Sequence, residues 1–191
     1  MTNRVAEFTV LRQTIAARGT ARMLLAAATV SLWATLATVL GLFSDLPLLA
    51  LIPLCALATG YETVWALHVG AERIGRFIQV EHETEPGQAS WETTAMQLGP
   101  GLPGGGVNPL FSVVFGAASV VNLGVAFAAE PTPLDVVLLC AGHAALLLRL
   151  AHTRVLAGRQ RQADLAAFTA VQRGHVVARA TRETSSETEK S

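Results

Sequence analysis

The sequence predicts an all-α integral membrane protein, a four-helix bundle of two transmembrane hairpins, with amphipathic cytoplasmic helices at the N-terminus, in the middle loop and at the C-terminus. Of its 191 residues, 51% are hydrophobic and only 15% are charged, whereas a soluble domain carries about a quarter charged residues. Charges are also nearly absent from four blocks, residues 23–43, 46–70, 109–129 and 132–152. Each block is long enough to cross a hydrocarbon core of roughly 30 Å as a helix.

The basic residues predict the orientation of these helices. Four arginines precede the first block, Arg73 and Arg76 begin the middle loop, and most of the others follow the fourth block. The two turns, FSDLP and AAEPTP, contain none. Because basic residues accumulate on the cytoplasmic side, both termini are expected in the cytoplasm. Arginine is far more frequent than lysine, which is typical of GC-rich bacteria, so the expected location is a bacterial cytoplasmic (inner) membrane.

Residues 1–22 are expected to form a cytoplasmic amphipathic segment. Val5, Phe8, Leu11 and Ile15 recur in it at helical spacing, among arginines and glutamate. Two arrangements fit this pattern equally well. The segment could lie along the membrane surface, or it could extend the first span into water.

The four blocks are expected to form two hairpins, residues 23–70 and 109–152, each closed by a short turn that contains proline. Proline is tolerated in the first turn of a helix, because the N–H that it lacks would have no partner there. The second and fourth helices are therefore expected to begin near Pro47 and Pro133. Pro53 lies one turn further along, where it is expected to kink the second helix.

Residues 71–108 are expected to form a cytoplasmic loop with a helical start and a Gly/Pro-rich end. Apolar residues at helical spacing continue through AERIGRFIQVEHETE, so the second helix is expected to stop just before Pro86. Ser90 can cap a short helix over ASWETTAMQLG. The stretch GPGLPGGGVNP is too rich in glycine and proline for regular structure.

Residues 153–180 are expected to continue the fourth span as an amphipathic cytoplasmic helix, and residues 181–191, TRETSSETEKS, to form a disordered tail. Arginines cover the polar face of this helix, which suits it to anionic lipid head groups or to a partner helix. Its apolar positions are Leu150, Val155, Leu156, Leu165, Phe168 and Val171.

Glu62 stands in an apolar stretch, GYETVWALHVG, about 21 Å along the second helix at 1.5 Å per residue. An ionised carboxylate at that depth costs several kcal/mol unless it is paired or hydrated. In the fourth helix, which runs in the same direction, His143 and Arg149 lie at about 15 and 24 Å. Glu62 is therefore expected to be a buried anchor, paired with Arg149, His143 or the Tyr61 region, that fixes how the hairpins pack. A proton or ion relay through Glu62, His68 and His143, a metal or haem site, and a protonated Glu62 that is simply tolerated remain as alternatives.

Other polar residues carry more local expectations. Asn122 in the third helix is expected to hydrogen-bond across helices, and Asp135 to be solvated or to cap the fourth helix. Glu81, His82 and Glu83 could hold a cation or a partner in the cytoplasm, although neighbouring carboxylates on one helix are usually only solvated. Lipid head-group contacts are expected of Arg18, Arg22, Arg73, Arg76 and Arg154.

The sequence contains no motif of the common catalytic classes. It lacks the GK[ST] of a phosphate loop, G-x-S-x-G and H-E-x-x-H. The net charge is zero, so nucleic acid is not an expected partner. Cys55 and Cys140 fall inside apolar blocks without metal-ligand spacing, and they are expected to be small buried hydrophobes. No catalytic residue, cofactor or metal is therefore predicted, and the expected partners begin with membrane lipids.

Small residues are frequent in the spans and permit close helix approach. This pattern favours a small non-enzymatic protein, an accessory or scaffolding subunit of a larger membrane complex, in contact with other membrane protein subunits or with copies of itself. The alternative is a small oligomeric transporter or channel, with Glu62, His68 and His143 as its ion- or proton-responsive group. A weaker third hypothesis is a membrane enzyme that acts on a lipid or quinone through His68, His82 and Glu81.

Overall fold

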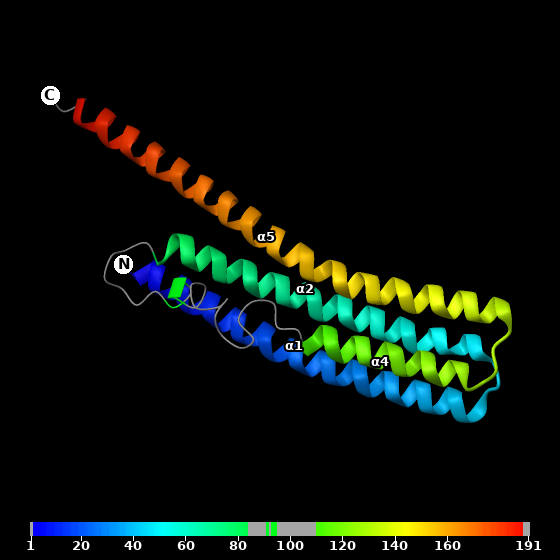
Figure 1. The fold of residues 1–191 in the computed structure, drawn as a ribbon. Helices are drawn as coiled ribbons and strands as arrows, with labels where there is room; N and C mark the ends of the chain where they lie inside the picture. The colour runs from blue at the N-terminus through cyan, green and yellow to red at the C-terminus, as the bar shows by residue number, and fades with distance from the viewer. Residues whose placement is uncertain (1, 84–90, 92, 95–109, 189–191) are drawn as a thin grey trace.

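The computed structural model describes residues 2–83, 91, 93, 94 and 110–188, which form helices and short turns without a strand (Figure 1). The long helices in this part of the chain are α1, Thr2–Phe43; α2, Leu51–Glu81; α4, Leu110–Phe127; and α5, Pro133–Thr188. A short 3-10 helix, η1, Pro47–Ala50, leads into α2. Each of the four long helices contains a stretch long and apolar enough to cross a membrane. The prediction of an all-α chain with four such helices is confirmed.

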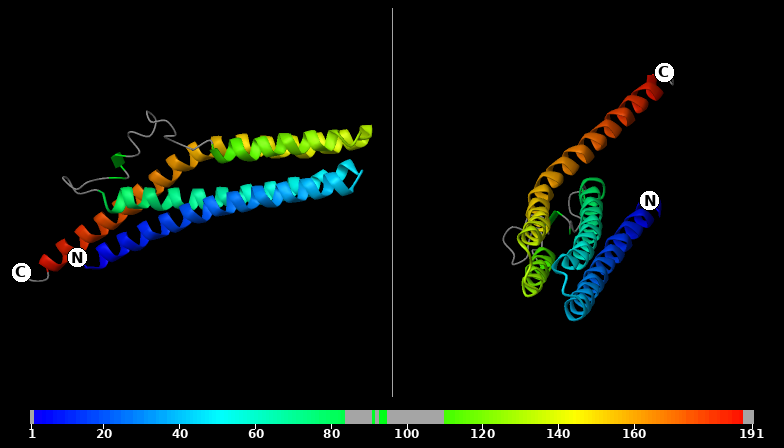
Figure 2. Two further views of the ribbon diagram at one scale, coloured as in Figure 1. Left: turned by 90° about the horizontal axis from the view of Figure 1, so that it is seen from below. Right: turned by 90° about the vertical axis from the view of Figure 1, so that its right-hand side faces the viewer.

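The two termini lie at one end of the molecule, here called the terminal end, and the two short turns lie at the opposite turn end (Figure 1). Helices α1 and α2 form one layer, and α4 and α5 form the other (Figure 2, left view). Toward the terminal end, α5 leaves its own layer and approaches α2. An ion pair between Asp164 of α5 and Arg76 of α2 joins the two helices there.

The start of α5 is stabilised by a reciprocal cap. The backbone N–H and the hydroxyl of Thr132 both donate to the Asp135 carboxylate, at 3.0 and 2.8 Å, and the N–H of Asp135 donates back to the Thr132 hydroxyl at 3.4 Å. This is the arrangement of a capping box. Pro133 follows the cap and occupies the first helical position, where its missing N–H has no effect.

The start of α2 differs from the expected one. Pro47 begins η1, and α2 itself begins at Leu51. Pro53 therefore lies in the first turn of α2, where N–H groups have no intrahelical partner to lose. The cause expected for a kink at Pro53 is absent, because no hydrogen bond of the helix interior is removed.

The core lies where α1, α2, α4 and α5 meet along their apolar lengths. Leu57 and Phe115 are completely buried, and the ring of Tyr61 meets that of Phe115 edge-on at 5.5 Å. Helices α1 and α2 approach each other closely at Gly60, where an added Cβ would overlap the side chain of Thr29. Gly60 is therefore required by packing, since any side chain there would push the two helices apart.

Helices α1 and α5 are both longer than one membrane span. α1 runs unbroken from Thr2 to Phe43, which corresponds to the second arrangement of residues 1–22, an extension of the first span. α5 has 56 residues, about 84 Å at 1.5 Å per residue. It continues to Thr188, so most of the segment expected to be disordered is helical. Extending an existing helix through residues such as Arg and Glu needs no new nucleation step.

The middle loop is described only in part. α2 ends at Glu81, close to the expected stop before Pro86. Most of the short helix expected after Ser90, and all of the stretch GPGLPGGGVNP, lie outside the described residues.

Candidate functional site

Asn122 of α4 is fully buried and links α1, α4, α5 and the start of α2 through its side-chain amide. The indole N–H of Trp33 donates to Asn122 Oδ1 at 3.2 Å. Asn122 Nδ2 donates to the carbonyl oxygen of Ala50 at 2.8 Å and to Nε2 of His143 at 3.1 Å. These four residues are called the Asn122 network below. The sequence predicted an interhelical hydrogen bond for Asn122 but gave no sign of Trp33 or Ala50.

The donor and acceptor chemistry of the partner atoms determines which atom carries each proton in this network. An indole N–H can only donate and a carbonyl oxygen can only accept, so the Asn122 amide has one allowed orientation. His143 Nδ1 lies 2.7 Å from the Leu139 carbonyl oxygen and must carry the ring proton, while Nε2 accepts from Asn122. His143 is therefore a neutral imidazole with both nitrogens satisfied. These two hydrogen bonds tie the His143 ring to α4 and to the preceding turn of α5.

Glu62 and Arg149 form a bidentate ion pair between α2 and α5. Arg149 Nε and Nη2 donate to the two carboxylate oxygens of Glu62 at 2.6 and 2.8 Å. The side chains are 45% exposed for Glu62 and 37% exposed for Arg149. The pairing expected from helical depth is present in the structure, but the pair is not a buried anchor. It lies on the outer surface of the packed helices because both side chains point away from the core.

A second polar contact between α2 and α5 lies close by in the chain, inside the core. The Tyr61 hydroxyl donates to Oγ1 of Thr153, which donates in turn to the Leu150 carbonyl oxygen at 2.8 Å. Tyr61 is 3% exposed and Thr153 is fully buried. The sequence did not indicate that Thr153 is buried, because this threonine lies next to the arginine-rich C-terminal segment.

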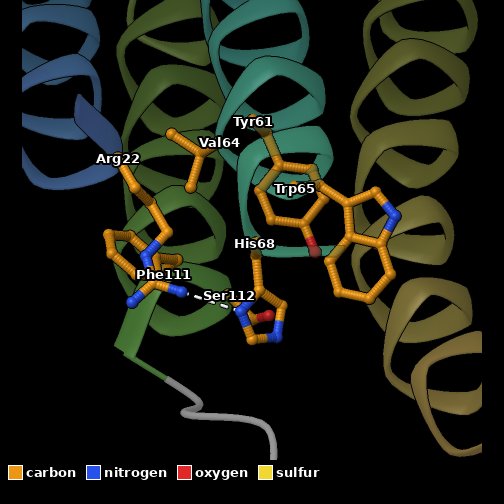
Figure 3. Close-up of a pocket in the computed structure, with 7 residues that line it drawn as sticks. All are labelled: Arg22, Tyr61, Val64, Trp65, His68, Phe111 and Ser112. Atoms are coloured by element: carbon orange, nitrogen blue, oxygen red, sulfur yellow. Dashed lines mark hydrogen bonds between the residues drawn. The ribbon is translucent and has the colours of Figure 1, made fainter. Parts of the chain in front are cut away.

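Arg22 and His68 lie together at a cavity between α1, α2 and α4 (Figure 3). Arg22 Nη1 donates to His68 Nδ1 at 2.7 Å. Because a guanidinium only donates, the ring proton of His68 is on Nε2. The guanidinium also lies 5.2 Å from the centre of the Phe111 ring, a cation–π distance. His68 therefore contacts Arg22, not Glu62 or His143.

Arg76 and Arg73 meet Asp164 beyond this cavity, toward the terminal end. The Arg76 side chain is 5% exposed and donates to Asp164 at 2.7 Å and to Glu72 at 3.4 Å. Arg73 lies 3.5 Å from the same aspartate. The expected lipid contact of Arg76 is therefore replaced by contacts within the protein, because Asp164 reaches it from α5. Arg154 is exposed, and Arg18 lies half-buried near Gly70.

Glu81, His82 and Glu83 do not converge on a common point. The Glu81 backbone carbonyl accepts from Arg4, and the His82 ring packs against Phe77 and Phe8. The Glu83 carboxylate accepts from Thr93 at 2.7 and 2.8 Å. Within the described parts of the chain, no three His, Cys, Asp or Glu side chains are grouped as metal ligands.

The two cysteines depart from expectation. Cys55 and Cys140 are both exposed on helix surfaces rather than buried. Their free thiols face outward with the exposed apolar residues.

Comparisons of the chain with protein-family models, with curated proteins and with solved structures gave no match.

Proposed function

We propose that the protein is a multi-pass protein of a bacterial cytoplasmic membrane and acts as a non-enzymatic accessory or scaffolding subunit of a larger membrane complex. Its four long helices cross the bilayer as a bundle of two hairpins, with the terminal end in the cytoplasm. Most of the arginines lie toward the terminal end, and the turns carry none, which supports this orientation.

The outer surface supports the membrane location. Large apolar side chains are exposed along the apolar part of each long helix, among them Leu24, Ile52, Val120 and Leu148. A soluble monomer rarely exposes apolar surface on this scale. Hydrocarbon around the helices removes the free-energy cost of exposing these apolar side chains to water.

The Glu62–Arg149 pair is the observation that carries the scaffolding role. A charged side chain near the centre of a membrane helix costs about 2.5–3.5 kcal/mol by insertion scales. Pairing cancels the net charge, yet more than a third of each side chain remains exposed. A helix of another subunit packed over the pair would supply polar contacts and exclude lipid. Alanines one turn away, Ala66 on α2 and Ala145 on α5, are exposed beside it and leave room for close approach.

The transporter hypothesis receives less support from the geometry. Glu62, His68 and His143 each bond a different partner, namely Arg149, Arg22 and Asn122. They do not form one hydrogen-bonded chain. A relay needs consecutive groups within hydrogen-bond reach of one another or of a shared water.

The proposal is tested by capturing the protein from its native membranes in a mild detergent and weighing the intact complex by native mass spectrometry. We expect masses that include other subunits in fixed ratio. The double variant Glu62→Leu/Arg149→Leu is expected to lose those subunits while the chain itself stays folded, because two apolar residues replace a neutral pair of similar volume.

The matched control is Val113→Leu/Val120→Leu, which alters two exposed apolar positions on α4 and leaves the pair intact. This control is expected to keep the subunits. Recovery of the wild-type chain alone, or as a ring of identical copies with nothing else bound, would refute the accessory role. A ring of identical copies would instead favour the transporter hypothesis, which flux assays on Glu62→Gln would then test.

A further inference from the structure

Two adjoining cavities flank the Arg22–His68 contact. The first, of about 20 Å³, is the one drawn in Figure 3. The second, of about 160 Å³, lies between α1 and α2 and adds Arg18 and Glu72 to its walls. Both cavities have Arg22 and His68 in their walls. The first therefore has room for one small polar group and the second for a larger one.

Two arginines at these cavities lack an ion-pair partner. Within the described residues, neither Arg18 nor Arg22 forms an ion pair, and the Arg22 Nε–H is buried without a hydrogen-bond partner. Glu72 is the carboxylate in the walls, and it contacts Arg76. An anion bound at Arg22 would therefore offset a positive charge that no ion pair among the described residues neutralises.

The donors around the first cavity suit the oxygens of a phosphate. The guanidinium of Arg22 is a planar fork that matches phosphate geometry. His68 adds an Nε2–H on the side of its ring away from the guanidinium, since Nδ1 is occupied by Arg22 (Figure 3). Ser112 adds a hydroxyl to the same wall (Figure 3).

The remaining walls are apolar. Val64, Trp65 and Phe111 line the first cavity together with the ring of Tyr61. A free phosphate ion gains nothing from such walls. A phospholipid gains binding free energy from both the donors and the apolar walls. Its phosphate contacts the donors, and its glycerol and acyl groups cover the aromatic side chains.

We propose that this site binds the phosphate of an anionic phospholipid, with Arg22 as the main contact, His68 and Ser112 as further donors, and Arg18 as a nearby cation. Its position next to the first residues of α4 corresponds to the head-group level of the cytoplasmic leaflet in the orientation proposed above. Basic pockets between membrane helices on that side commonly hold anionic head groups.

The test measures lipid binding to the purified full-length chain by native mass spectrometry, with phosphatidylglycerol and with phosphatidylcholine of the same acyl chains. We expect the first phosphatidylglycerol to bind about tenfold more tightly than phosphatidylcholine, because both lipids carry the phosphate but the choline ammonium adds a positive charge beside Arg22 and Arg18. Arg22→Gln should abolish this preference. Arg22→Lys keeps the charge without the fork and should reduce the preference only in part.

Arg154→Gln is the control, because Arg154 is an exposed arginine outside both cavities, and it should keep the full preference. If Arg22→Gln misfolds, as judged by gel filtration and circular dichroism, Arg22→Lys and Ser112→Ala provide the same comparison. An equal, small loss in Arg22→Gln and Arg154→Gln would overturn the site in favour of general charge attraction. Displacement of the lipid by inorganic phosphate would overturn the lipid as the occupant.

Discussion

Replacing Asn122 tests whether the Asn122 network holds the helices together. Its amide makes three hydrogen bonds, to Trp33, Ala50 and His143. Hydrogen bonds between helices within membranes contribute about 0.6 kcal/mol each on average, so losing three costs about 2 kcal/mol. The partners are then left unsatisfied in the core, and a small cavity forms, which adds roughly 1–2 kcal/mol. Asn122→Ala should therefore lower the free energy of unfolding by about 3–4 kcal/mol.

The measurement is a titration with sodium dodecyl sulfate in mixed micelles. Unfolding is followed by limited proteolysis rather than by tryptophan fluorescence, because the substitution changes the surroundings of Trp33. Asn122→Leu separates the two causes, because it keeps most of the volume and removes the hydrogen bonds. Asn122→Leu should therefore show most of the decrease in the free energy of unfolding that Asn122→Ala shows.

Ser119→Ala is the matched control for Asn122. Ser119 lies on the same helix, one turn earlier, and is also completely buried, but its hydroxyl has no partner in the described structure. Removing an unpartnered buried hydroxyl should leave the stability unchanged within about 0.5 kcal/mol or raise it. Equal losses in Asn122→Ala and Ser119→Ala would refute the assignment of stability to hydrogen bonds rather than to packing volume.

Two further substitutions test the packing. Gly60→Ala places a methyl group against Thr29 and should cost about 1–3 kcal/mol; Thr29→Ala in the same chain should restore part of this in the detergent titration, and a lack of rescue would contradict the close approach. Asp164→Ala leaves Arg76 with only the longer contact to Glu72 and should loosen α5 by about 1–3 kcal/mol. Trypsin should then cleave α5 at Arg159, Arg161 and Arg173 several-fold faster, whereas the exposed control Glu7→Gln should cleave at the wild-type rate; equal rates would speak against the ion pair.

The sequence predicted the helices well, because hydropathy and proline positions determine where long apolar helices begin and end. It also brought Glu62 and Arg149 together, since two helices that start at the same level and run in the same direction place residues of similar depth side by side. Depth says nothing about rotation around the helix axis. Rotation decides whether the pair faces the core or the surface, and the structure has it at the surface.

The contacts at the terminal end were less accessible to sequence reasoning. Arg76 was expected at lipid head groups, but Asp164, 88 residues further along the chain, reaches it from α5. Trp33 was not singled out because an isolated tryptophan in an apolar block has no periodic signal. The Arg22 cavity depends on three helices meeting, whereas the sequence alone showed only that Arg22 precedes the first apolar block.

The uninterrupted length of α5 has a mechanical consequence. The helix is held to α2 as far along as Gln172, whose side-chain amide donates to the Val80 carbonyl oxygen at 2.8 Å. From Gln172 the helix extends 16 residues to Thr188, about 24 Å. A stiff rod of that length is a lever arm. A tilt of roughly 10° about Gln172 would move its tip by about 4 Å at 1.5 Å per residue, so small changes in the packing of α2 against α5 are magnified at the C-terminal tip.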